Sequence, residues 1–329
     1  MKPALVTGAT GFVGSHLATR LLALGRPVRL LVRDPGRLAP DLRARACTVT
    51  GDLADPASLF PAVDGVGEIF HCAANVRTWD RPEAYRQANA AGVGHLLDAI
   101  ARLPEPPVRF VHFSSADVYG FPRQPAAEDM VSGPTGYGYG DSKQAGESLL
   151  REWGGALGLP WTILRPCNVM GPGSPFIERI GRELRGGLML TVDGGRENCG
   201  YLDVHNLVDA ALWAAEADAA VGGTFNVRDP VDISWNRFVQ DLRQAVQGRG
   251  VVLDLPYRLA MGAAHLLSAP YRALGLRGEP LLHPLLVQIF GRTCGHPTGR
   301  LQAAGAPLGR VDYATSLALA ASTWPPRRP

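Results

Sequence analysis

One tyrosine and one lysine near the middle of the chain stand at a spacing that suits proton transfer. The stretch YGYGDSK contains Tyr137, Tyr139 and Lys143. On a helix, residues four apart lie on one face, which pairs Tyr139 with Lys143 and leaves Tyr137 pointing elsewhere. An ammonium beside a phenol favours the phenolate, so we expect Lys143 to lower the pKa of Tyr139. Tyr139 would then give a proton to an alkoxide forming from a ketone, or take one from an alcohol.

A hydroxyl group is also needed to hold the oxygen of such a substrate. The run HFSSADVYG places Ser114 and Ser115 at the end of an apolar stretch that predicts a strand. The carboxyl ends of parallel strands form the ligand crevice of α/β sheets. Both serines are therefore candidates for the site, with a turn or capping role as the alternative.

A glycine-rich turn near the N-terminus predicts a dinucleotide site. Three glycines follow the apolar run Ala4–Thr7 and precede a helical pattern, with the spacing GxxGxxG rather than GxGxxG. Glycines allow a tight turn and close backbone approach, and a helix N-terminus presents free N–H groups to a pyrophosphate. An ordinary turn between strand and helix is the alternative. The residues assigned to the cofactor here are Gly8, Thr10, Gly11, Phe12, Val13 and Gly14.

The end of the second expected strand bears on the choice of cofactor. It reads LVRDPGR, and an arginine there accommodates the 2′-phosphate of NADP(H), whereas an acidic residue binds the ribose hydroxyl of NAD(H). Arg33 and Arg37 favour NADP(H) and Asp34 favours NAD(H). We expect NADP(H) to be favoured over NAD(H), with Arg33 reading the phosphate. Asp52, after the third strand, is placed to meet the adenine amino group, with a turn-forming role as the alternative.

The alternation of apolar runs and helical patterns predicts the fold class. It indicates an α/β protein with a Rossmann-type, doubly wound parallel sheet. We assign residues 1–171 to a dinucleotide-binding Rossmann domain, to which residues 201–227 return. Residues 172–200 and 228–329 are assigned to a smaller, mostly helical substrate region. The expected strands are Ala4–Thr7, Val28–Arg33, 47–53, 68–74, Arg109–Ser115 and Trp161–Pro166.

Composition excludes several classes of protein. The 329 residues carry a formal charge of +3 and are 46% hydrophobic, which is enough for a substantial core. Lysine and arginine are scattered, so no nucleic acid is expected as a partner. No apolar run reaches transmembrane length, so no integral membrane segment is expected. The five cysteines form no C-x-x-C pair, which predicts no metal site, no disulfide framework and a cytoplasmic localisation.

Taken together, the motifs resemble the extended short-chain dehydrogenase/reductase family over nearly the whole chain. The segments that carry the resemblance are TGATGFVG, GDL, HCAA, NAAGVGHLLDA, FSSADVYG, YGDSK, RPCNVMGPG and YLDVHNLVDA. The resemblance implies that Ser115 binds the substrate oxygen, that Tyr139 is the general acid–base and that Lys143 also holds the nicotinamide ribose. It implies further cofactor contacts from Leu53, Cys72, Ala73, Ala74, Asn89, Ser114, Pro166, Asn168 and Val169, with Asn89 in a structural rather than a catalytic role. It also implies a homodimer formed through helices around Ala91–Ala101 and Tyr139–Trp153.

Branches of that family differ at the serine motif and in the C-terminal half. Nucleotide-sugar dehydratases carry STDEVYG, whereas this chain has Ala116 and Asp117 in place of the acidic pair, so dehydratase activity is not expected. The run LLVRDP and the segment from Leu255 to Phe290 resemble the 3β-hydroxysteroid dehydrogenase-like and dihydroflavonol-reductase-like branch. An apolar second region with few paired basic residues favours a small hydrophobic ketone or alcohol as substrate. Two alternatives remain open: a nucleotide-sugar epimerase with tightly bound NAD, and a non-catalytic dinucleotide-binding regulator.

Overall fold

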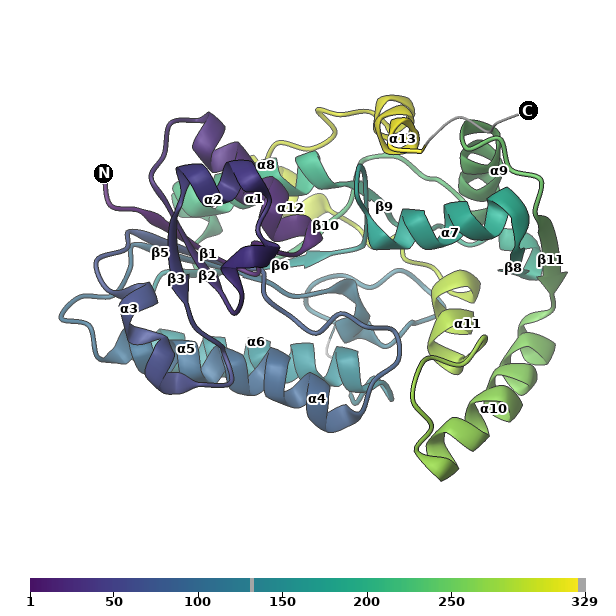
Figure 1. Ribbon diagram of the computed structural model, residues 1–329, viewed down its shortest axis with the longest axis horizontal. Coiled ribbons are helices and arrows are strands. Elements are labelled where there is room, and N and C mark those ends of the chain that lie inside the picture. Colours follow the sequence, from purple (N-terminus) through teal and green to yellow (C-terminus); the bar gives the residue numbers. More distant parts are fainter. Residues whose placement is uncertain (131–132, 325–329) are drawn as a thin grey trace.

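The computed structural model describes residues 1–130 and 133–324 and is built around one parallel sheet (Figure 1). Seven strands lie in the order β10-β6-β5-β4-β1-β2-β3, and every neighbouring pair is parallel. Their carboxyl ends therefore meet at one edge of the sheet, as the predicted fold class requires. The strands are β1 (Ala4–Thr7), β2 (Val28–Val32), β3 (Cys47–Thr50), β4 (Glu68–His71), β5 (Arg109–Phe113), β6 (Trp161–Pro166) and β10 (Thr224–Val227).

Helices cover both faces of the sheet, which confirms the doubly wound arrangement. Alternate strand residues point to opposite faces. Phe70 and Val111 pack with α1 (Phe12–Ala23), α2 (Pro40–Arg45), α8 (Val204–Glu216) and α12 (Gly299–Ala303). Ile69 and Phe110 pack with α3 (Phe60–Val63), α5 (Gly92–Ala101) and α6 (Gly138–Ala156). Short 3-10 turns lie at Pro35–Arg37, Pro56–Ser58, Ala116–Tyr119, Asp193–Gly195 and Asp218–Ala220.

The helical segment after β4 is interrupted. It consists of α4 (Pro82–Arg86), a π-helical turn (Gln87–Ala91) and α5, which follow one another directly. Asn89 lies in the π-helical turn and is buried.

The later part of the chain forms a second core with its own small sheets. β7 (Asn168–Met170) pairs with β9 (Tyr201–Asp203), and β8 (Leu188–Val192) pairs with β11 (Val251–Leu255). The helices here are α7 (Pro175–Gly186), α9 (Trp235–Ala245), α10 (Tyr257–Leu274), α11 (Pro284–Gly291) and α13 (Tyr313–Ser322). Of the segment expected to return to the main sheet, β10 joins it and α8 covers it, whereas β9 belongs to a small sheet. The domain boundaries given above stay a prediction.

A buried ion pair joins α6 to β6. Arg165 donates to both carboxylate oxygens of Glu147, through Nε at 2.9 Å and Nη2 at 2.7 Å. Nη1 of Arg165 also donates to the hydroxyl of Tyr119 at 2.8 Å, and that hydroxyl donates to Asn226 at 2.7 Å. Burial raises the pKa of Glu147, but its bonds to Arg165 outweigh this effect and the net shift is downward. The pair therefore connects the helix that carries Tyr139 with two strands and the turn after β5.

We expect Arg165→Met to lower the free energy of unfolding by about 3 kcal/mol, because it leaves a buried carboxylate with one remaining charged partner. That partner is Arg151, whose Nη2 lies 2.8 Å from Glu147 and whose side chain is 39% exposed. Arg151→Met is the matched control and should cost about 1 kcal/mol or less. Because the folded pKa of Glu147 is lowered, its stabilisation is present at neutral pH and lost as the pH falls through that folded pKa. Urea unfolding of Arg165→Met and Arg151→Met measures the two losses of unfolding free energy. Equal losses would contradict the larger role given to Arg165.

Candidate active site

Tyr139 and Lys143 lie in the first turns of α6, at the carboxyl edge of the sheet. The helix begins at Gly138, and Tyr137 is the extended residue before it. Lys143 is buried, and its Nζ donates to the carbonyl oxygen of Phe113, at the end of β5, at 2.7 Å. Tyr139 stands one turn earlier on the same helix face, as the spacing predicts.

Ser115 begins the 3-10 turn after β5 and faces Tyr139. Its Oγ accepts a hydrogen bond from the backbone N–H of Asp117 at 3.1 Å. A hydrogen bond also joins the side chains of Ser115 and Tyr139. The structure thus brings Ser115, Tyr139 and Lys143 together, while their catalytic roles stay a proposal.

The pKa of Tyr139 differs from the expectation. Burial raises it, the nearby carboxyl of Asp117 raises it further, and the hydrogen bond with Ser115 offsets only part of the shift. The prediction that Lys143 lowers this pKa is wrong, since burial and Asp117 raise the pKa and the ammonium of Lys143 is directed at the Phe113 carbonyl. Burial also lowers the pKa of Lys143 itself, to about 8.

Asp117 is a site residue that the sequence analysis did not propose. Burial raises its pKa to about 6, while a hydrogen bond with Ser115 and the charge of Lys143 act in the opposite direction. Its carboxyl therefore lies within reach of both Ser115 and Tyr139. The signal was present in the sequence, because Asp117 follows Ser115 by two residues in the same turn.

The glycine turn has the close backbone contacts that a dinucleotide site requires. Gly8 has φ +74°, and a Cβ on Gly14 would lie 2.4 Å from the carbonyl oxygen of Gly8. A Cβ on Gly8 would lie 2.8 Å from the backbone of Ala73, after β4. The hydroxyl of Thr7 accepts from the Ala73 N–H at 3.1 Å and holds β1 and β4 in this arrangement. Only glycine fits at these two positions, so the turn fits the pyrophosphate of a nicotinamide dinucleotide.

The charged residues expected near the adenosine differ in whether their side chains already form hydrogen bonds. Arg33 is exposed after β2. One carboxylate oxygen of Asp34 accepts from the N–H of Gly36 at 2.8 Å, which caps the following turn. Asp52 forms a similar turn with the N–H of Ala54 at 3.0 Å, so its turn-forming role is present in the structure. One carboxylate oxygen of Asp34 is therefore already used in a hydrogen bond of the turn. Arg33, in contrast, is exposed at the surface.

Two other expected cofactor residues hold backbone segments. The amide of Asn89 donates to the carbonyl oxygen of Asn75 and to the hydroxyl of Ser142, and accepts from the N–H of Asn75. These bonds tie the π-helical turn to the segment at Asn75 and to α6, and the role of Asn89 beside the cofactor stays a prediction. The amide of Asn168 donates to the carbonyl oxygen of Cys199 at 2.6 Å. The remaining expected residues, Thr10, Phe12, Val13, Leu53, Cys72, Ala73, Ala74, Ser114, Pro166 and Val169, follow or end strands at the carboxyl edge or begin α1.

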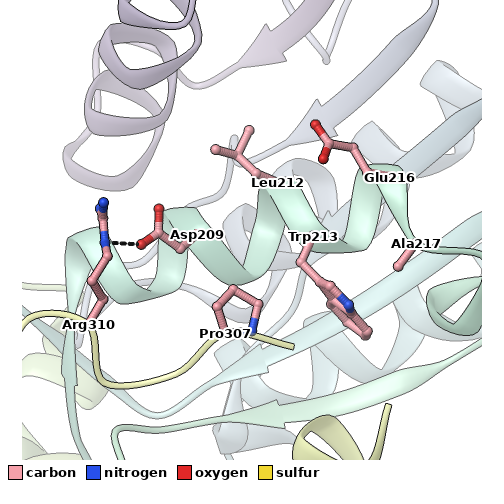
Figure 2. Close-up of a pocket in the computed structure, with 7 residues that line it drawn as sticks. All are labelled: Asp209, Leu212, Trp213, Glu216, Ala217, Pro307 and Arg310. Carbon is pink, nitrogen blue, oxygen red and sulfur yellow. Dashed lines mark ion pairs between the residues drawn. The ribbon is translucent and has the colours of Figure 1, made fainter. Parts of the chain in front are cut away.

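A separate pocket lies on α8, as Figure 2 shows. An ion pair of 2.6 Å between Arg310 and Asp209 borders it, and Trp213 lines it. None of the residues that line this pocket is a candidate catalytic or cofactor-binding residue, so we treat it as separate from the candidate active site.

Comparison with known proteins adds relatives with named activities. A sequence model described as "NAD dependent epimerase/dehydratase family" matches residues 4–227. The chain is 27% identical to a 2-alkyl-3-oxoalkanoate reductase of Stenotrophomonas maltophilia over 86% of this chain and 88% of the relative. It is 27% identical to a 4-hydroxy-2-methyl-3-oxo-4-farnesyl-3,4-dihydroquinoline-1-oxide ketoreductase of Stigmatella aurantiaca, over 87% and 86% of the two chains.

A solved structure has the same fold. It is the UDP-glucuronic acid 4-epimerase of Bacillus cereus in complex with UDP-glucuronic acid and NAD. The TM-score is 0.76 at 20% identity, over 97% of this chain and 98% of that chain.

We expect Asp117→Asn to lower the pKa of Tyr139 by about one unit, because the variant removes a nearby negative charge. The pKa is measured by NMR titration of protein labelled with 13C at tyrosine Cζ, with Tyr139→Phe identifying the signal. Asp98→Asn, which removes an exposed carboxylate on α5, is the control and should leave the pKa in place. An unchanged pKa in Asp117→Asn would show that the carboxyl does not act on Tyr139.

Proposed function

The chain belongs to the NAD dependent epimerase/dehydratase family, and we propose that within it the protein is an NADP(H)-dependent ketoreductase or alcohol dehydrogenase. It is an NAD(P)-dependent oxidoreductase of the short-chain dehydrogenase/reductase type. The observation that carries the finer proposal is the cluster of Ser115, Tyr139 and Lys143 at the sheet edge beside the glycine turn.

The protein's residues have distinct tasks in this proposal. When bound, the nicotinamide supplies or accepts the hydride. Ser115 holds the oxygen of the substrate, and Tyr139 gives that oxygen a proton as the carbonyl is reduced. The raised pKa of Tyr139 keeps its phenol protonated at neutral pH, which suits a proton donor in the direction of reduction. Lys143, held by the Phe113 carbonyl, stands one helical turn from the phenol and is placed to bind the nicotinamide ribose.

The surroundings of the site favour an apolar substrate. Phe121, Tyr137 and Met170 belong to the second core, together with residues of α7 and α11. A nucleotide sugar would require free basic residues for its diphosphate. Two arginines on this side are already engaged: Arg179 pairs with Glu183 and Glu279, and Arg292 lies over the ring of Tyr257 at 3.6 Å. The two relatives named as reductases of ketones support the same substrate class.

We expect Tyr139→Phe to lower kcat by about 10²- to 10⁴-fold, because the variant loses the proton donor. Its affinity for NADPH should remain within about threefold, since the pyrophosphate and ribose contacts remain. Tyr137→Phe is the matched control, because it removes a phenol hydroxyl two residues away that bonds to Gln288. Steady-state rates with a panel of ketones and calorimetric titration with NADPH give the two quantities. Equal loss of turnover and of cofactor affinity would reject the role of Tyr139.

We expect Arg33→Ala to weaken NADPH binding at least tenfold, about 1.4 kcal/mol, and to leave NADH binding unchanged. The reason is that only NADPH carries the 2′-phosphate. Arg37→Ala, at the other end of the short turn, is the control and should have a smaller effect. Calorimetry on protein freed of cofactor measures both affinities, and equal losses for NADPH and NADH would contradict the assignment.

The state of the cofactor in purified protein separates this proposal from the epimerase alternative. A ketoreductase exchanges its cofactor at each turnover, so little should be released on denaturation. One retained NAD per chain would instead favour the epimerase, and failure to bind either dinucleotide would favour the regulator. Homodimerisation through α5 and α6 and a cytoplasmic localisation stay predictions.

A further inference from the structure

The outer face of α10 is apolar and exposed. Leu259, Leu266 and Leu274 are 65%, 76% and 73% exposed. Leu259 and Leu266 lie seven residues apart, on one side of the helix, and Pro270 and Ala273 continue the same side. Figure 1 shows α10 at one edge of the molecule. Leu267, Leu276 and Leu281 extend the apolar surface and are 45%, 47% and 81% exposed.

The opposite face of α10 packs against the second core. Ala260, Ala264 and Ser268 recur every four residues and are buried. Tyr257 begins the helix, and its hydroxyl donates to Gln288 of α11 at 2.8 Å. The exposed leucines are therefore not needed for folding contacts within the chain. Contiguous exposed apolar surface of this kind marks a contact site.

The charges around this face are of one sign. Arg258 and Arg272 lie fourteen residues apart along its flank, and Arg277 lies just beyond the helix. Arg272 also lies over the ring of Trp79 at 5.5 Å. No aspartate or glutamate occurs between Leu255 and Gly278. The first acidic residue after this segment, Glu279, is paired with Arg179 at 2.8 Å and with His283 at 2.9 Å. An apolar face with a basic flank is the pattern of helices that lie in the interface of anionic membranes.

We propose that the outer face of α10 docks on an anionic lipid surface. Within the residues described, no helix is long and apolar enough to cross a membrane, so the contact is one of lying on the bilayer. The leucines enter the boundary between headgroups and acyl chains, and the arginines meet anionic headgroups. In this orientation the bilayer lies on the outer side of α10 and α11. The inner side of these helices faces the candidate site, because Gln288 of α11 forms hydrogen bonds with Tyr257 of α10 and with Tyr137.

Flotation of the full-length protein with lipid vesicles tests the proposal without any turnover. The probes are vesicles of phosphatidylcholine alone and vesicles of phosphatidylcholine with one quarter phosphatidylglycerol. We expect at least tenfold stronger binding to the anionic vesicles, weakened by 0.5 M salt because the arginine contribution is screened. Leu266→Gln/Leu274→Gln should lower this binding at least tenfold, and Arg258→Glu/Arg277→Glu should remove the preference for anionic lipid.

The matched control removes two exposed apolar side chains elsewhere. Leu24 and Val108 are 48% and 60% exposed and lie outside α10, so Leu24→Gln/Val108→Gln should bind vesicles as the parent does. Far-UV circular dichroism and thermal unfolding verify that each variant is folded. Absence of binding to anionic vesicles, or equal binding by the α10 and control variants, would overturn the proposal. A further outcome would also overturn the proposal: the parent protein is a dimer that does not bind vesicles, and Leu266→Gln/Leu274→Gln dissociates it. A second copy of the chain would then occupy the outer face of α10. Since none of these outcomes involves catalysis, they are distinguishable from a failure of the proposed function.

Discussion

The carboxylate of Glu147 ties together the helix, the strand and the turn on which the candidate catalytic residues depend. Tyr139, Lys143, Glu147 and Arg151 recur every four residues on α6, so one helix face carries both the chemistry and its anchor. Arg165 binds that carboxylate with two hydrogen bonds and reaches Tyr119 at the end of the turn that starts after Ser115. A charge so deeply buried is costly unless it is fully bonded, so α6 cannot slide or rotate without losing the pair.

Small residues let α6 approach its neighbours closely enough for this pair to form. A Cβ on Gly146 would lie 2.6 Å from the carbonyl oxygen of Asn89, in the π-helical turn. A Cβ on Gly140 would lie 2.6 Å from the carbonyl oxygen of Asp117. The helix thus touches two backbone segments directly, which places its first turn against the Ser115 turn. Geometry at the site is consequently set by backbone contact as well as by the ion pair.

Local patterns in the sequence were sufficient to predict most strands of the main sheet. Apolar runs bounded by turns predicted β6 at Trp161–Pro166, and the four-residue spacing predicted that Tyr139 and Lys143 share a face. The small sheets were missed because β7 and β9 are only three residues long and β11 has exposed valine and leucine, without a buried alternation. The interruption at Gln87–Ala91 leaves no mark on helical periodicity.

Long-range electrostatics could not be read from spacing. Tyr119 and Asn226 are 107 residues apart, so their hydrogen bond appears only in the folded chain. The predicted direction of the Tyr139 pKa shift was wrong for a related reason. Spacing shows that a lysine is near, but not that its ammonium is held by a backbone carbonyl or that burial dominates.

The two separate cores have a consequence for how such a chain diversifies. The inward face of α6 carries the ion pair, the close backbone contacts and the candidate proton donor together. The wall formed by α10 and α11 packs in a different core and meets the site from outside, through Phe121 and Tyr137. Mutations that reshape that wall leave the cluster of Ser115, Tyr139 and Lys143 in place. Changes in this C-terminal wall can therefore alter the shape of the candidate site while the cluster on α6 stays in place.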